Sequence, residues 1–184
     1  MMKKTFALLL LASVSFISPA FSEKKPTKPT EMPVASGCGD PAVRFDVKTV
    51  GSTKPVQPEP GKALVYFFQD DSQFASFPKP TDRVGIDGAW VGATHRDSYF
   101  YFSVDPGVRH ICVNWQSQEV FGERRPIAAM QFRPIAGGVY YFLAKDIFLP
   151  DVEGVRPLTL TQVGADQGEL LIHAFDLAIS RRKK

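Results

Sequence analysis

The sequence predicts a mostly β fold, an antiparallel β-sandwich or open barrel of about eight strands with a C-terminal helix. Three observations predict it. From residue 42 onward, apolar residues recur mainly at every second position, which is the period of a half-buried strand. Many of these positions hold β-branched or aromatic residues, as strands favour. Turn signals built from glycine, proline and aspartate separate the runs.

The expected strands are short runs of this kind, and they lie at residues 43–47, 63–68, 83–86, 89–92, 99–104, 108–115, 127–132, 139–145 and 158–163. Asp87-Gly88 predicts a hairpin between the third and fourth runs, because both residues accept the positive φ angles of a type I′ turn. Asp105-Pro106-Gly107 predicts a second hairpin, formed by residues 99–104 and 108–115.

The C-terminal stretch has a different pattern. Residues 167–180 contain no proline, and their leucines and alanines recur at three-to-four spacing, which predicts a helix with Asp166 as its N-cap. A terminal strand is the alternative, since Ile172, Phe175 and Ile179 leave few strictly polar positions. The basic residues 181–184 are expected to form a solvated tail.

The N-terminus has the organisation of a secretory signal peptide, residues 1–22: two lysines, an apolar run and small residues before the expected cleavage after Ser22. The apolar run, residues 6–17, is shorter than the roughly 20 residues that span a bilayer, so no transmembrane segment is expected. Cys38 lies too far from this run to be a lipid-modified cysteine. The sequence therefore predicts a periplasmic or secreted protein.

The proline-rich residues 23–37 predict a disordered tether, and residues 38–180 a single β-sandwich domain. Cleavage removes two lysines, so the formal charge falls from +3 to +1, which argues against a nucleic-acid partner.

Two cysteines in an exported chain predict a disulfide between Cys38 and Cys112. A catalytic thiol is the alternative, because His110, Cys112 and Asn114 lie on one side of the same expected strand. Residues two apart on a strand are separated by about 7 Å, which is too far for a nucleophile and its base. No catalytic residue is therefore assigned.

His95 and Asp97 lie in the connection between the two expected hairpins, where acid–base chemistry is conceivable. One histidine and one carboxylate are not a metal signature, and no cofactor motif is present, so neither a metal nor a cofactor is expected. A solvated turn is the simpler interpretation of these residues.

Aromatic residues supply the candidate binding positions. Along residues 99–104, Tyr99 and Tyr101 alternate with Phe100 and Phe102, so the phenylalanines are expected in the core and the tyrosines on the other face. The tyrosine face either contacts a ligand or lies buried beneath the helix. Trp90, just after the Asp87-Gly88 turn, is the best candidate for an exposed stacking surface. The alternative is that Trp90 lies in the core, where its truncation would unfold the protein.

Several blocks resemble the bacterial domain-of-unknown-function family 2846 (DUF2846): residues 60–67, 83–92 and 98–104, the turn at 105–107 with His110, and residues 138–142. Residues 83–115 are also weakly similar to PEGA-type β-sandwich modules of bacterial envelopes. The resemblance implies an exported envelope protein and brings no catalytic residue.

Two function classes therefore remain open. The first is a noncatalytic binding or interaction module that contacts an envelope protein or a glycan through Trp90, Tyr99, Tyr101 or His95. The second is an envelope hydrolase with a dispersed site near His95.

Overall fold

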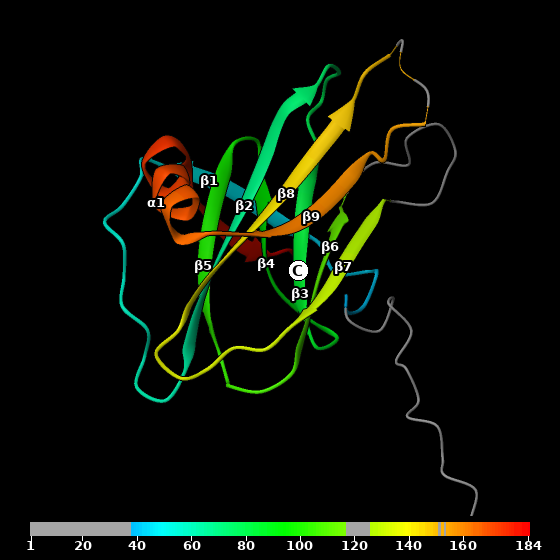
Figure 1. Ribbon diagram of the computed structural model, residues 1–184. Helices are drawn as coiled ribbons and strands as arrows, with labels where there is room; N and C mark the ends of the chain where they lie inside the picture. The colour runs from blue at the N-terminus through cyan, green and yellow to red at the C-terminus, as the bar shows by residue number, and fades with distance from the viewer. Residues whose placement is uncertain (1–37, 117–125, 151, 153) are drawn as a thin grey trace, which may run out of the picture. The chain divides into compact units, whose positions relative to one another are not determined.

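The computed structural model describes residues 38–116, 126–150, 152 and 154–184, and within them the chain forms ten strands and one helix (Figure 1). The helix is α1 (Ala165–Ala174). The strands are β1 (Phe45–Val50), β2 (Ala63–Phe74), β3 (Thr81–Ile86), β4 (Ala89–His95), β5 (Ser98–Val104), β6 (Arg109–Trp115), β7 (Ile127–Phe132), β8 (Val139–Phe148), β9 (Leu158–Val163) and β10 (Asp176–Arg182).

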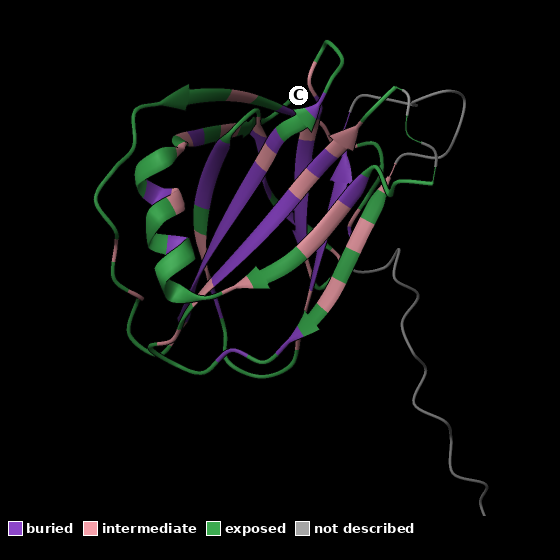
Figure 2. Ribbon diagram, turned by 45° about the horizontal axis from the view of Figure 1, so that its top comes forward, coloured by how far each residue is buried: buried purple, intermediate pink, exposed green. Residues whose placement is uncertain are grey.

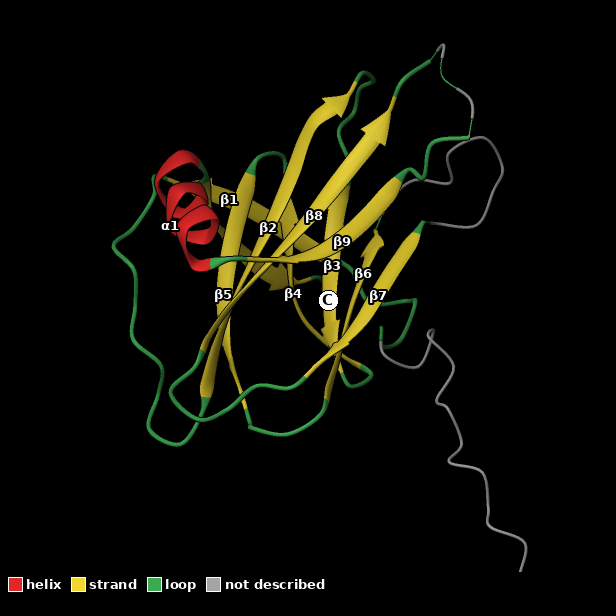
Figure 3. Cartoon of the chain, in the orientation of Figure 1, coloured by secondary structure: helices red, strands yellow, loops and turns green. Residues whose placement is uncertain are grey.

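The strands form two sheets that pack face to face, so the mostly β, sandwich-like fold with a C-terminal helix is confirmed (Figure 3). The larger sheet has the order β1-β10-β5-β2-β8-β9, and the smaller has the order β4-β3-β6-β7. They do not close into a barrel. Two pairings, β10 with β5 and β2 with β8, are parallel, so the sandwich is mixed rather than wholly antiparallel.

One expected hairpin is confirmed and the other is wrong. β3 and β4 pair through Asp87 and Gly88, whose φ angles are 48° and 88°. The turn at residues 105–107 instead carries the chain from one sheet to the other, because β5 belongs to the larger sheet and β6 to the smaller. Apolar side chains of both strands thereby belong to the same core between the sheets.

The helix ends earlier than its sequence pattern predicts. α1 stops at Ala174, Phe175 is extended, and residues 176–182 form β10 between β1 and β5. The strand alternative therefore holds for this segment, since it gains two hydrogen-bonded neighbours there. The expected basic tail is also corrected: Arg181 and Arg182 belong to β10, and the Lys183 Nζ atom lies 2.9 Å from Asp46 Oδ1.

The apolar core lies between the sheets, along the middle of the central strands (Figure 2). Phe100 is buried in it and Phe102 packs against it, so the expected face assignment of β5 is confirmed. On the other face, Tyr99 is buried in an aromatic cluster together with Ile172 of α1. Tyr101 is 37% exposed. The tyrosine face is therefore mostly a second buried layer beneath the helix.

Candidate functional site

A group of polar side chains lies buried between the sheets near the C-terminal end of β8. We call it the acidic cluster, and its members are Gln69, Asp71, Asp82, Thr94 and Asp146. The alternation that buries apolar residues also places these side chains inside. Asp146 has the same parity as Phe142 and Ala144 on β8, and Asp82 has the same parity as Val84 on β3.

Asp146 links the two sheets. Its Oδ1 accepts a hydrogen bond from Trp115 Nε1 of the smaller sheet, and its Oδ2 accepts one from Gln69 Nε2 of the larger sheet, both at 2.6 Å. The side chain is 0% exposed. These two donors are the partners of a carboxyl group that bulk water does not reach.

Five of the remaining cluster oxygens have no hydrogen-bond partner among the described residues. Both carboxylate oxygens of Asp82 lack one, as do Gln69 Oε1, Asp71 Oδ2 and Thr94 Oγ1. Thr94 lies directly opposite Asp82 in the β3–β4 register, so the two side chains are neighbours. Unpartnered buried acceptors are costly and uncommon in folded proteins. Among these five oxygens only the Thr94 hydroxyl can donate, and it carries a single O–H, so the cluster has more acceptors than donors.

Burial raises the pKa of all three carboxyl groups. For Asp82, burial and then the nearby charges of Asp146 and Asp71 raise the pKa well above its usual value of 3.8. For Asp146, burial raises the pKa to about 7, although the hydrogen bonds from Gln69 and Trp115 oppose this shift. The pKa of Asp71 is raised by burial and by Asp97, and lowered by Lys79.

The cluster does not have the arrangement of a metal site among the described residues. Within the part of the chain that the structure describes, no group of three or more His, Cys, Asp or Glu side chains is arranged to hold a metal ion. Sequence reasoning missed the cluster, because aspartates such as Asp82 and Asp146 normally lie on the surface. Their alternation with the buried apolar residues of the same strands was the signal that could have indicated burial.

His95 is half-buried at the end of β4, close to the acidic cluster. Its Nδ1 lies 3.0 Å from the carbonyl oxygen of Pro80 and 3.1 Å from Thr81 Oγ1. The carbonyl can only accept, so Nδ1 carries the proton and has no lone pair with which to activate the threonine hydroxyl. Ser98 Oγ donates to the main-chain carbonyl of His95. The described contacts thus hold the turn together and form no nucleophile–base pair.

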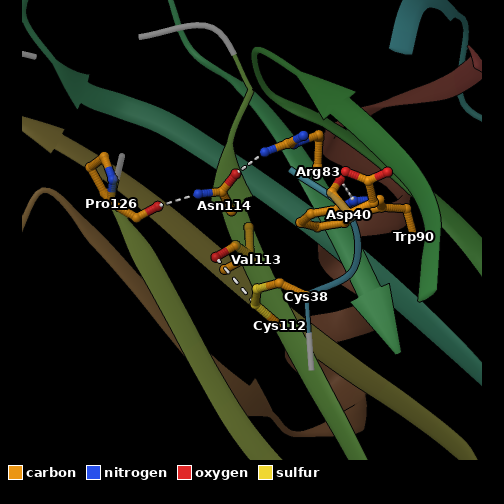
Figure 4. The surroundings of a disulfide bond; sticks show 8 residues. All are labelled: Cys38, Asp40, Arg83, Trp90, Cys112, Val113, Asn114 and Pro126. Atoms are coloured by element: carbon orange, nitrogen blue, oxygen red, sulfur yellow. Dashed lines mark hydrogen bonds between the residues drawn. A yellow bond between two sulfur atoms is a disulfide. The ribbon is translucent and has the colours of Figure 1, made fainter. Parts of the chain in front are cut away.

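The Trp90 side chain is buried, so the expectation of an exposed ring is wrong. The side chain is 9% exposed, and its Nε1 donates to the carbonyl of Asp40 at 2.6 Å (Figure 4). The Arg83 guanidinium lies 4.4 Å from the ring centroid. We call residues 38–44 the N-terminal strap; they run across the outer face of the smaller sheet and cover this tryptophan.

The expected disulfide joins Cys38 of the strap to Cys112 of β6 (Figure 4). Beside it, Arg83 is almost fully buried and donates to Asn114 Oδ1 and to the carbonyls of Pro41 and Val43. The bridge and the arginine fasten the strap at both ends.

A groove of about 480 Å³ lies between β7 and β9, which run side by side at the margins of the two sheets (Figure 1). Each of these strands has one hydrogen-bonded neighbour among the described residues, so each presents an unpaired edge. Ile127 is 48% exposed, and Arg156 at the rim forms no ion pair with a described residue. The groove is lined by Pro126, Ile127, Ala128, Ala129, Arg156, Pro157, Leu158, Thr159 and Leu160.

Residues 59–157, just over half of the chain, match the family model described as protein of unknown function (DUF2846). The chain belongs to the DUF2846 family. The match to DUF2846 contains β2 to β8 and with them every member of the acidic cluster, whereas Cys38, α1 and β10 lie outside it. No curated protein and no solved structure matches the chain. No described helix has the length and apolar character needed to cross a membrane.

Proposed function

We propose that this DUF2846 protein is exported to the periplasm or beyond the cell, where its β-sandwich serves as a noncatalytic interaction module. Residues 1–22 would be removed as a signal peptide, and residues 23–37 would tether a domain that begins at residue 38. The bridge between Cys38 and Cys112 supports export, because such bonds persist in oxidising compartments.

One contrast supports a binding role. Asp82 and Asp146, whose pKa values burial raises, are 0% exposed and therefore closed off from any substrate. The groove between β7 and β9, in contrast, is open and flanked by two unpaired strand edges. Such edges offer main-chain N–H and C=O groups to another polypeptide.

The chemistry of the groove favours an extended segment of an envelope protein as its occupant. Main-chain groups of the two edges would hydrogen-bond to the segment, and the exposed side chain of Ile127 would contact it. The small Ala128 and Ala129 leave room for close approach. Arg156 favours an acidic residue near one end of the segment.

Site-specific photocrosslinking from position 127 in the native cells tests this proposal. We expect crosslinks that map to an extended segment of an envelope protein, and we expect Ala129→Tyr to abolish them by filling the groove. Val50→Tyr, at an exposed position of β1, is the matched control and should leave them intact. Crosslinks that Ala129→Tyr leaves unchanged, or crosslinks only to a second copy of this chain, would contradict the proposed occupant.

A further inference from the structure

The acidic cluster has fewer hydrogen-bond donors than acceptors. Its two donor nitrogens are already used: Trp115 Nε1 donates to Asp146, and Gln69 Nε2 donates to Asp146 and to the carbonyl of Pro80. Five side-chain oxygens then remain without a partner. With both Asp82 and Asp146 ionised, two negative charges would also share a region that solvent does not reach.

The charged groups around the cluster do not neutralise this pair. Lys79 lies 3.5 Å from Asp71 Oδ1 and otherwise donates to main-chain carbonyls, and Lys145 pairs with Asp70 at 3.7 Å. Asp82 and Asp146 form no ion pair among the described residues. The titratable groups that face the pair from the surrounding elements are Asp70 and Asp71 of β2, Lys79 of the β2–β3 connection, His95 of β4, Asp97 of the β4–β5 turn and Lys145 of β8.

Binding of one proton would reduce both the excess of acceptors and the uncompensated negative charge. Bound to either carboxyl group, it removes one negative charge and creates an O–H donor. Unpartnered acceptors lie close by: Thr94 Oγ1 is opposite Asp82 in the register, and Gln69 Oε1 belongs to the amide that is bonded to Asp146.

We propose that the acidic cluster is a proton-binding site which keeps this end of the sandwich closed, so that loss of the proton at alkaline pH loosens β3 and β4 around Asp82 and Thr94. The two carboxyl groups belong to different sheets, Asp82 to the smaller and Asp146 to the larger one, so repulsion between them when both are ionised acts across the sandwich. This inference does not depend on the proposed binding role of the β7–β9 groove.

The direction of the pH effect follows from the raised pKa values. A carboxyl group whose pKa is higher in the folded than in the unfolded state binds more protons when folded, so stability falls as pH rises between the two values. For Asp146 this interval runs from 3.8 to about 7. Over most of this interval, each unit by which the pH rises lowers the folding equilibrium constant about tenfold for one such carboxyl group. A carboxylate in a salt bridge has a lowered pKa in the folded state, so its contribution to stability increases as pH rises.

Urea unfolding from pH 5 to pH 9 tests the site, with Asp82→Asn and Asp146→Asn as variants and Asp176→Asn, an exposed carboxylate on β10, as the matched control. The neutral amide imitates a protonated acid. We expect the wild-type folding equilibrium constant to fall at least tenfold between pH 5 and pH 8. Either cluster variant should reduce this fall, whereas the control should not.

Two further measurements on the wild-type protein keep the proposal testable if a variant fails to fold. Infrared spectroscopy at pH 5.5 should detect a protonated buried carboxyl group, and its band should disappear as pH rises. Hydrogen exchange of the Thr81–Arg83 and Ala93–His95 amides, corrected for the intrinsic rate, should accelerate at pH 8.5. Absence of the infrared band, or the same pH dependence in wild type and both cluster variants, would overturn the proposal. So would a stabilisation by calcium that removes the pH dependence, since a cation would then occupy the site.

Discussion

The two outer faces of the sandwich are covered by different means. Over the larger sheet, α1 lies on an aromatic and aliphatic cluster that includes Tyr66, Phe68, Tyr99, Tyr141 and Ile172. Over the smaller sheet, the N-terminal strap of seven residues covers Trp90 and Ala93. From α1, Ile172 is buried in this cluster and Leu171 packs against it, whereas the strap is short and contains a turn at residues 41–42.

The two coverings are held by different kinds of interaction. The helix packs against several large aromatic side chains of the sheet, and this apolar contact stabilises it. The strap contributes Cys38 and Val43 to its cluster and loses conformational entropy when it is ordered. It is held instead by a disulfide, by the hydrogen bond from Trp90 to Asp40 and by a buried arginine that bonds to its carbonyls.

The largest expected effect comes from removing the covalent fastening of the strap. The bridge spans 74 residues of sequence, and closing a loop of that size is worth about 4 kcal/mol in the chain-entropy model. We expect Cys38→Ser with Cys112→Ser to lower the free energy of unfolding by about this amount in urea titrations. Reduction of the wild-type protein should give the same midpoint. An unchanged midpoint would show that the strap needs no covalent fastening.

The helix-covered face should respond instead to a change in shape. A Cβ atom at Gly168 would lie 2.2 Å from Cδ1 of the Tyr141 ring, so the helix must move away from the sheet. We expect Gly168→Ala to cost about 2–3 kcal/mol, despite the better helix propensity of alanine. Gly164→Ala is the matched control, because nothing lies within 4 Å of its Cβ position. Equal thermal unfolding of the two variants would contradict this account.

The smallest expected effect concerns the polar contacts at the margin of the helix-covered face. The hydroxyl of Tyr99 accepts a hydrogen bond from the main-chain N–H of Thr53, and that of Tyr66 accepts one from Val56. Tyr99→Phe and Tyr66→Phe should each cost about 1 kcal/mol. Tyr101→Phe removes a hydroxyl from a partly exposed ring and should change the urea midpoint much less. If either tyrosine variant lost as much stability as the variant without the disulfide, polar contacts would fasten both faces equally, which would contradict the proposed difference between them.

Local sequence signals predicted the parts of this fold that depend on local chemistry. The Asp87-Gly88 turn is specified by two adjacent residues, and the burial of Phe100 and Phe102 follows from strand alternation. The partner of β5 could not be predicted in this way, because the choice between sheets is made by distant strands. The C-terminal end of the helix was wrongly predicted for the same reason, because pairing with β1 and β5 holds residues 176–182 as a strand.

The candidate sites were harder to predict than the fold. The presence of two cysteines and the expected oxidising compartment were enough to predict the Cys38–Cys112 bridge. Trp90 was misplaced because a position near a hairpin tip is normally exposed, and no local pattern indicates that residues 38–44 cover it. The acidic cluster was missed because its members come from four strands, β2, β3, β4 and β8, and become neighbours only when the two sheets pack.

The position of β10 has a consequence for how the chain matures. This strand is synthesised after the other nine, yet it lies inside the larger sheet, between β1 and β5. While the ribosome has not yet released residues 176–182, the first strand has no place to dock, because its hydrogen-bonding partner is β10. Vectorial synthesis therefore cannot complete the sheet step by step. The larger sheet can form its β1–β10–β5 portion only after residues 176–182 are available to pair.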